Sequence, residues 1–397
     1  MCLCFGVPVW LLDHRQTTTS PFTHFPSIYS QLSRHIYFLS LFSELIFSLE
    51  SPNIHSPEHS KLHPAVLKLG LEYASGAIRG GNARCRALLQ CFHQVLDDYQ
   101  PPADIPDYRV HLDTQVLKPS FTYWTIHCRP HSVSMGNAFT FLKSAVASMD
   151  RTLEWTEAKE MLQESIQQYL LERIQLADQV IAQHALCKIA EGDVILTLGH
   201  SEAVAVLLET ACQTKNFFVW VVDSRPLYEG KILLKRLQTA GISCGYIHLN
   251  AVAYVIPKVT KALLGASALC SNGSIYGRVG TACVALLAKD HHIPTLVCCE
   301  TYKISNRVQL ESITHNEVGN PETLLSYTSN TSTSRNKEQP SPLHQWKEQP
   351  NLKLLNILYD VTPSEYISGI CTEVGIIPPT SVAVLLREMH PGMAAAY

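Results

Sequence analysis

The sequence has 397 residues, of which 46% are hydrophobic and 16% charged, a composition that allows two globular domains with buried cores. With 31 basic and 34 acidic residues the formal net charge is -3. This balance argues against direct DNA binding or a general nucleic-acid role, because such proteins carry clustered positive charge.

Cysteine usage indicates reduced thiols. The thirteen cysteines lie mostly inside apolar runs, as Cys270, Cys298 and Cys299 do, where a thiol behaves as a small hydrophobe. We therefore expect a cytosolic protein. The close pairs Cys2/Cys4 and Cys298/Cys299 have no second pair at zinc-ribbon spacing, so we expect no metal site.

Residues 1–60 differ from the rest of the chain, since Ser, Thr, Pro and His separate short apolar clusters. The apolar stretch 36–49 is shorter than the roughly 20 residues that a membrane span needs. The amino terminus lacks the basic region of a signal peptide. We expect a poorly ordered leader and no membrane segment, with a membrane-surface helix as the alternative.

Residues 61–190 are predicted to form a helical domain. Val66, Leu69 and Tyr73 are spaced by three and four, as on one face of a helix. The same spacing returns in 85–92, 139–146 and 156–190, and prolines at 101, 102 and 106 interrupt it, because proline removes a helix donor.

Residues 191–397 are predicted to form a Rossmann-like α/β domain, because short apolar runs alternate with helix-like stretches and such alternation is typical of a parallel sheet. The expected strands are 194–198, 217–222, 244–249, 266–270 and 295–299, and a sixth apolar run covers 352–359. The expected helices are 202–212, 230–240, 252–264 and 278–289. A polar insertion at about 326–349 is expected to be a flexible loop.

The turn after the first expected strand contains Gly199, His200 and Ser201. It lacks the three glycines of a dinucleotide-binding fingerprint, so no cofactor is expected there. A serine at this position favours helix capping over nucleophilic catalysis with the neighbouring histidine.

Three loops at expected strand ends contain groups that bind anions. Arg225 follows the second strand and either holds a phosphate or braces its loop, and the structural role is favoured. Asn272 and Gly273, with Arg278 after them, suit either an anion or tight packing, and packing is slightly favoured. The charged and aromatic segment 300–303 suits a partner interface as much as a ligand pocket.

Taken together, these motifs resemble the family of the alpha, beta and delta subunits of eukaryotic initiation factor two B, which also contains ribose-bisphosphate and methylthioribose-phosphate isomerases. The resemblance runs from about residue 63 to 387 and is greatest to the delta type. The motifs that carry it are SGAIRGGNARCRALL at 75–89, HCRP at 127–130, VVDSRP at 221–226, SNGSIYGRVGT at 271–281, VCCETYK at 297–303 and LLNILYDVTP at 354–363.

The resemblance implies a non-catalytic regulatory subunit of a guanine-nucleotide exchange complex for initiation factor two. It implies alpha, beta, gamma and epsilon type subunits as partners, together with initiation factor two and its phosphorylated alpha subunit. Residues Ile304, Leu352 and Leu354 match family segments at a subunit interface, and the alternative is that Leu352 and Leu354 are buried strand residues.

The isomerase relatives use a cysteine after the first strand and an aspartate after the third, and the resemblance places Gly199 and Leu249 at those positions. Neither residue transfers a proton, so the isomerase alternative is disfavoured. Arg225, Asn272, Gly273 and Arg278 leave open a vestigial phosphate pocket, and with it a sugar- or nucleotide-phosphate sensor as the other alternative.

Overall fold

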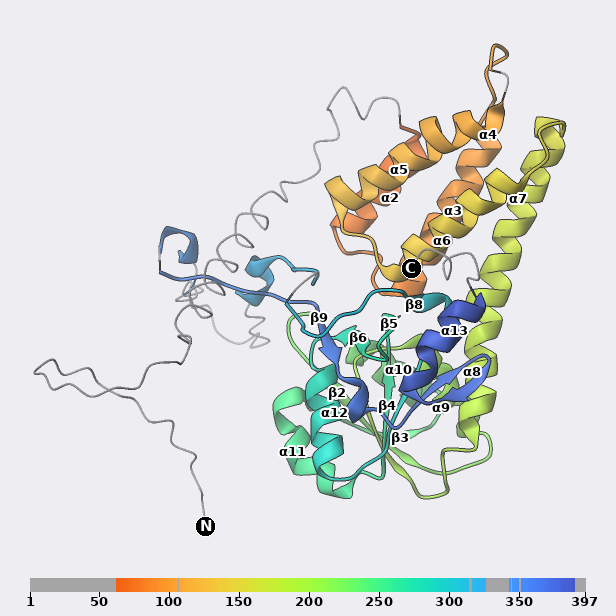
Figure 1. Ribbon diagram of the computed structural model, residues 1–397. Coiled ribbons are helices and arrows are strands. Elements are labelled where there is room, and N and C mark those ends of the chain that lie inside the picture. The colour runs from red at the N-terminus through yellow and green to blue at the C-terminus, as the bar shows by residue number, and fades with distance from the viewer. Residues whose placement is uncertain are drawn as a thin grey trace, which may run out of the picture. The chain divides into compact units, whose positions relative to one another are not determined.

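The computed structural model describes residues 62–105, 107–313, 316–325, 343, 345–349 and 351–389 (Figure 1). The expected leader 1–60 and most of the expected insertion 326–349 lie outside these ranges. Within these ranges no helix is long and apolar enough to cross a lipid bilayer.

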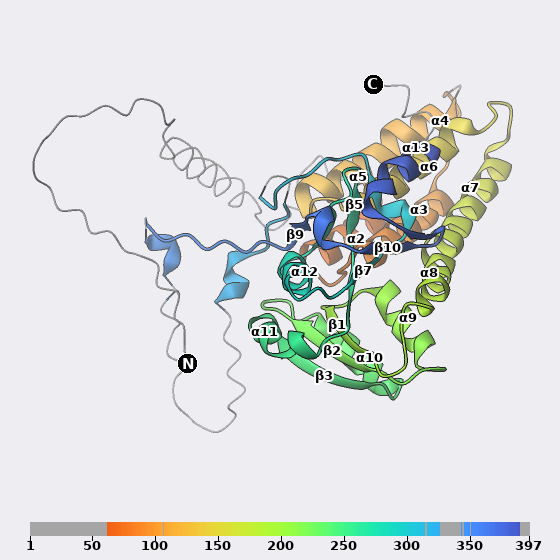
Figure 2. The same ribbon diagram turned by 60° about the horizontal axis from the view of Figure 1, so that its bottom comes forward.

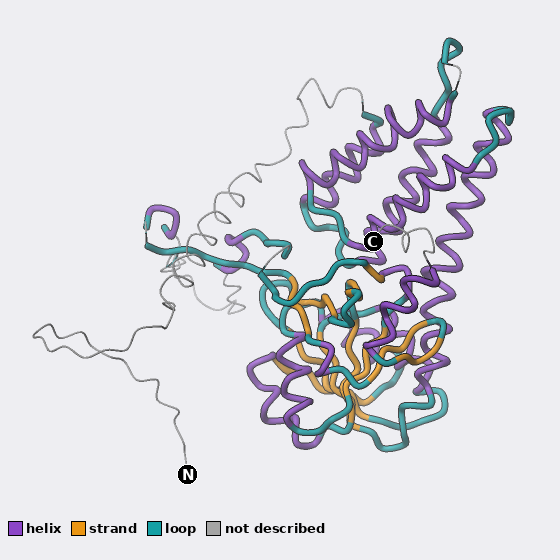
Figure 3. The backbone as a smooth tube through the Cα atoms, viewed as in Figure 1, coloured by secondary structure: helices purple, strands orange, loops and turns teal. Residues whose placement is uncertain are grey.

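Helices make up the first part of the described chain, and strands begin only after residue 190 (Figure 3). The helical part is built around Trp124, which is fully buried, packs edge to face on Phe92 at 5.2 Å and donates its indole N–H to the Val66 carbonyl at 2.8 Å. Its helices are α2 (Pro64–Ala74), α3 (Gly81–Asp98), α4 (Tyr108–His111), α5 (Lys118–Tyr123), α6 (Val133–Ser148), α7 (Trp155–Tyr169) and α8 (Ala177–Leu186).

Three wide, π-helical turns interrupt the α-helices, and the first two explain why helical periodicity did not predict residues 108–128 as helix. They cover Leu112–Leu117, Trp124–Cys128 and Leu170–Leu176. The buried side chains of Leu112 and Leu117 lie five residues apart, a spacing that a search for three and four does not detect. The third turn joins α7 to α8, so the expected helix 156–190 is one continuous helical run with a π-helical middle.

The α/β fold predicted from the sequence is confirmed by a seven-stranded sheet of order β11-β10-β7-β4-β1-β2-β3. All neighbouring strands are parallel except β10 and β11, and Figure 2 shows β1, β2 and β3 side by side. The strands are β1 (Val194–Leu198), β2 (Phe218–Asp223), β3 (Ser243–His248), β4 (Lys261–Gly265), β7 (Thr295–Cys298), β10 (Gly369–Thr372) and β11 (Gly375–Ile377).

Helices cover both faces of this sheet. Successive strand residues point to opposite faces, so neighbouring residues of one strand pack in different cores. Leu263 of β4 packs in a core with α8, α9 (Glu202–Ala211) and α10 (Gly230–Thr239), whereas Leu264 packs in a second core on the other face. That second core includes residues from α11 (Val252–Val255), α12 (Thr281–Asp290) and α13 (Val382–Met389).

Three expected elements were placed wrongly. The expected helix 252–264 ends early, in a short turn Ile256–Lys258 that contains Pro257, and the apolar residues after it form β4 at the centre of the sheet. The expected strand 266–270 becomes β5 (Ala268–Cys270) of a separate four-stranded sheet with β6 (Ile275–Arg278), β8 (Ile304–Ser305) and β9 (Tyr359–Thr362). The run 352–359 is mostly irregular, and only its last residue enters β9.

Truncating a leucine of the central strand should test this arrangement. Leu263 is fully buried between two helical layers, so Leu263→Ala should lower the free energy of unfolding by about 2–5 kcal/mol. The matched control is Leu286→Ala, because Leu286 is 49% exposed on α12, and its loss should stay near 0.5 kcal/mol. Urea denaturation measures both, and equal losses would contradict a central position for β4.

Candidate functional site

A cavity of about 310 Å³ opens where the carboxyl ends of β1 and β4 meet the start of α3. Leu198 and Gly265 line it from the sheet, and Arg79, Gly81 and Arg86 line it from the helical part. Ligands of open parallel sheets bind at this edge, so this cavity is the candidate site.

Positive side chains outnumber acids around the cavity. Arg79, Arg86, Arg278 and Lys303 line it, together with the acidic Glu202 and Glu229. The Arg278 guanidinium makes two hydrogen bonds to the Glu229 carboxylate, at 2.8 and 2.6 Å. Lys303 is also paired, with its Nζ 2.6 Å from Oε2 of Glu300, a residue that does not line the cavity. The net excess of positive charge suits an anion.

His200 and Ser201 lie at the cavity wall but offer little for catalysis. Burial lowers the pKa of His200, and its Nε2 lies 3.9 Å from the nearer Glu202 oxygen. Ser201 occupies the N-cap position of α9, yet its side chain makes no capping hydrogen bond. The predicted capping role is therefore wrong. Ser201 instead packs against Gly265, where an added Cβ would lie 2.4 Å from its hydroxyl oxygen.

The two positions that match the isomerase catalytic residues are structural here. Gly199 has a φ of +63° in the turn after β1, a conformation that glycine adopts readily. Leu249 follows β3 and its Cδ2 would lie 3.0 Å from a Cβ placed on Gly280. Neither side chain holds a proton that a general acid or base could transfer.

Of the four predicted phosphate-binding residues, the structure brings two together. Arg225 and Arg278 both line a small hollow of about 20 Å³ beside Gly199. Arg225 donates a long hydrogen bond, 3.4 Å, from its Nη2 to the Leu324 carbonyl. This contact fits the favoured bracing role, although this partner lies on another segment of the chain.

Asn272 and Gly273 line neither of these two cavities. The Asn272 side-chain amide donates to the Gln309 carbonyl at 3.1 Å, and a Cβ on Gly273 would lie 2.5 Å from the Pro379 carbonyl oxygen. Tight packing, the slightly favoured interpretation, accounts for both residues.

The start of α12 is closed to an external anion by the chain's own carboxylate. Asp360 Oδ2 accepts the backbone N–H groups of Gly280 and Ala282 at 2.7 and 3.0 Å. Burial raises the pKa of Asp360 to about 6, although these N–H groups favour the ionised form. A carboxylate at a helix N-terminus takes the place that a phosphate would occupy.

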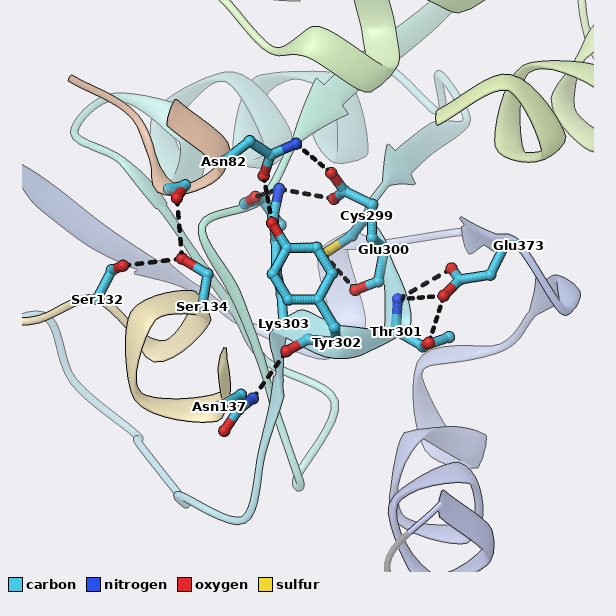
Figure 4. A network of polar contacts seen from close by, with 12 residues as sticks. Asn82, Ser132, Ser134, Asn137, Cys299, Glu300, Thr301, Tyr302, Lys303 and Glu373 are labelled. Atoms are coloured by element: carbon cyan, nitrogen blue, oxygen red, sulfur yellow. Dashed lines mark hydrogen bonds and ion pairs between the residues drawn. The ribbon is translucent and has the colours of Figure 1, made fainter. Parts of the chain in front are cut away.

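Residues 300–303 take part in a buried network of polar contacts (Figure 4), and Lys303 also lines the cavity. Glu300, Tyr302 and Lys303 are 0%, 5% and 7% exposed, so the partner-surface interpretation of this segment is wrong. The Asn82 amide donates to Glu300 Oε1 at 2.5 Å, and the Tyr302 hydroxyl donates to Asn82 Oδ1 at 2.8 Å. From α6, Asn137 donates to the Tyr302 carbonyl at 2.7 Å. The segment therefore joins the end of β7 to α3 and α6.

Sequence reasoning missed that role. The residue types gave no signal for burial, because Glu and Lys are rarely fully buried unless they are paired. The family motif at 75–89 contained Asn82, but nothing in its spacing indicated a contact 218 residues away. Throughout the described ranges, no group of three His, Cys, Asp or Glu side chains is placed to bind a metal ion.

The three interface candidates lie in different environments. Ile304 is 3% exposed and packs in the core of its own chain. Leu352 and Leu354 are half-buried in an irregular segment, so the interpretation of both as buried strand residues is wrong.

Comparison with known proteins gives concordant results for sequence and structure. The "Initiation factor 2 subunit family" matches residues 77–379. The translation initiation factor eIF2B subunit delta of Schizosaccharomyces pombe is 41% identical over 351 residues, 88% of this chain and 73% of that protein. The corresponding subunit of Dictyostelium discoideum is 40% identical over 92% of this chain but only 56% of its own length, so the chain spans little more than half of that relative.

A solved structure supports the same assignment. The crystal structure of the tetrameric eIF2B-beta2-delta2 complex from C. thermophilum contains a chain that is 33% identical, with a TM-score of 0.68 over 79% of this chain and 92% of that chain. Archaeal ribose 1,5-bisphosphate isomerases are similar at 28% to 33% identity over 66% of this chain. With three quarters of its length matched by the family and delta-type relatives at about 40% identity, the chain belongs to the initiation factor 2 subunit family.

Proposed function

We propose that this chain is a non-catalytic, delta-type regulatory subunit of the eIF2B guanine-nucleotide exchange complex, acting in translation initiation in the cytosol. The observation that supports this most is the likeness to a chain of the eIF2B-beta2-delta2 tetramer, which covers 92% of that chain. Gly199 and Leu249 at the isomerase positions agree with a scaffold that lacks the chemistry of its enzyme relatives.

The partners proposed for this role are beta, alpha, gamma and epsilon type subunits, with initiation factor two as substrate. Residues 61–190 and 191–397 are proposed as separate domains with separate duties. The helical domain would contact initiation factor two, including its phosphorylated alpha subunit, and the sheet domain would contact other subunits. Phosphorylation adds a double negative charge, which is sufficient to alter such a contact.

The proposed subunit contact includes the irregular segment before β9. Leu352 and Leu354 are half-buried there and Leu355 is 50% exposed. Three leucines that keep apolar surface in contact with water, within four residues of one another, are suited to burial in a partner. Ile304 is buried in its own chain and would support this surface from within.

Co-purification tests the assignment. Tagged full-length chain, co-expressed with a beta-type subunit, should elute as a stable complex on size-exclusion chromatography. Leu354→Asp should weaken that complex at least about tenfold, because a buried interface charge lacks a partner. The control is Tyr254→Asp, on an 85% exposed side chain of α11, which should assemble normally. Failure of the unaltered chain to bind the beta-type subunit would overturn the proposal.

A second candidate function rests on the 310 Å³ cavity and its four cationic side chains. A sugar- or nucleotide-phosphate bound there would make this subunit a metabolite sensor without making it an enzyme. Arg278 and Lys303 already pair with carboxylates. The positive charge for a bound phosphate would therefore come from Arg79, in the turn before α3, and from Arg86 in α3.

Thermal unfolding in the presence of ribose 5-phosphate tests the sensor function. A ligand that binds only the folded chain raises the unfolding temperature with its concentration. The shift should disappear in Arg79→Gln and persist in Arg151→Gln, a matched change of an exposed arginine between α6 and α7. Inorganic phosphate serves as the probe for a bare anion site, and no shift with either compound would contradict the sensor function.

A further inference from the structure

Asp178 on α8 interacts electrostatically with Glu300 and Lys303, two ionisable residues of the turn after β7. Asp178 of α8 is 4% exposed, and Glu300 and Lys303 of that turn are 0% and 7% exposed. Two carboxyl groups thus share one ammonium group away from water. If all three were ionised, the cluster would carry a net negative charge, which is costly in a protein interior.

The two acids differ in whether a cation lies directly against the carboxylate. Glu300 has the Lys303 ammonium at 2.6 Å on one oxygen and the Asn82 amide at 2.5 Å on the other. Within the described part of the chain, Asp178 Oδ1 and Glu300 Oε2 are both buried without a hydrogen-bond partner, but only Glu300 Oε2 has the Lys303 ammonium in ion-pair contact. A proton is therefore best placed on Asp178, from where it can be donated toward Glu300.

Acidic and neutral groups also lie around Asp178. Glu202 of α9 adds negative charge, and Cys299 and Tyr302 are buried neutral neighbours. Glu373, after β10, accepts the backbone N–H of Thr301 at 2.9 Å and also adds negative charge beside the turn. Lys303 is the cation among the main influences on Asp178, and Glu300 already holds it.

We propose that Asp178, Glu300 and Lys303 form a proton-linked latch, in which one proton on Asp178 keeps α8 seated against the turn after β7 and loss of that proton loosens the contact. The latch reaches beyond α8. Glu300 also holds α3 through Asn82, and Lys303 lines the 310 Å³ cavity. A second ionised carboxylate would compete for Lys303 and so weaken both contacts. This inference does not rest on the proposed role in the exchange complex.

The pKa of Asp178 agrees with the geometry. Burial, and then the charge of Glu300, raise it from 3.8 to about 8, while Lys303 acts in the opposite direction. Burial alone would also raise the pKa of Glu300, yet Lys303 and Asn82 outweigh burial and lower it. Because the folded chain holds a proton on Asp178 that the unfolded chain releases at lower pH, the stabilising protonation is complete below pH 4 and is lost as pH rises to about 8.

The test compares Asp178→Asn with the unaltered full-length chain from pH 6 to pH 9. The amide keeps the shape and a donor toward Glu300 but does not titrate. Over this range the unfolding equilibrium constant of the unaltered chain should rise about a hundredfold relative to the variant, since each pH unit below the folded pKa changes it about tenfold. Other titrating groups are common to both proteins and cancel.

The matched control is Asp193→Asn. Asp193 is also buried, at 6% exposed, but its Oδ2 lies 2.6 Å from the Lys261 ammonium. Burial opposes ionisation there, yet Lys261, the Ala190 N–H and Thr260 outweigh it and lower the pKa. Asp193→Asn should therefore shift stability by the same amount at every pH from 6 to 9, where Asp193 is ionised in both the folded and the unfolded chain.

Infrared spectroscopy of the unaltered chain supplies a readout that does not depend on whether a variant folds. A protonated carboxyl band should persist at pH 7, where Asp360, with a pKa of about 6, is mostly ionised, and it should disappear by pH 9. Asp178→Asn should lose most of that band at pH 7. Parallel pH profiles for the variant and the unaltered chain, or no protonated carboxyl at pH 7, would overturn the latch.

Discussion

The buried ion pair between Glu300 and Lys303 is the contact on which the arrangement of the two parts depends. It lies directly after β7, near the middle of the sheet, and Glu300 binds Asn82 at the start of α3. A buried pair of this kind adds little stability in itself, because desolvation offsets the attraction between the charges. Its value lies in position, since removing either partner would leave an unpaired charge at the junction.

The cavity follows from that junction. Because Asn82 is fixed at Glu300, the residues on either side of it, Gly81 and Ala83, come to face the carboxyl edge of β1 and β4. The fold thus keeps the ligand cleft common in open parallel sheets. Its reactive positions hold Gly199 and Leu249, and Asp360 fills the start of α12. The chain shares the fold of the isomerases, but residues that only pack stand at the positions of their catalytic groups.

Charged side chains around the cavity are also paired with one another. Arg236 holds Glu202 and Glu209 through four hydrogen bonds of 2.8 to 2.9 Å and so fixes α10 to α9. Arg278 is fixed by Glu229. Most cations that face this edge are therefore committed to partners within the chain, as expected for a scaffold whose shape has to persist while other proteins bind.

The sequence by itself determined the fold class, the order of a helical part before a parallel sheet, and the strands β1, β2, β3 and β7, because buried parallel strands are continuous apolar runs that are readable locally. It also determined the family, through several short motifs in a fixed order. Only the tertiary structure decided that residues after Pro257 form the central strand β4, since an apolar run of that length suits helix and strand equally. Only the structure placed Asn82 on Glu300 and Asp178 beside it. Spacing along the chain gives no information about contacts between residues more than a hundred positions apart. Burial, which sets the charge of these groups, arises only once the chain has folded.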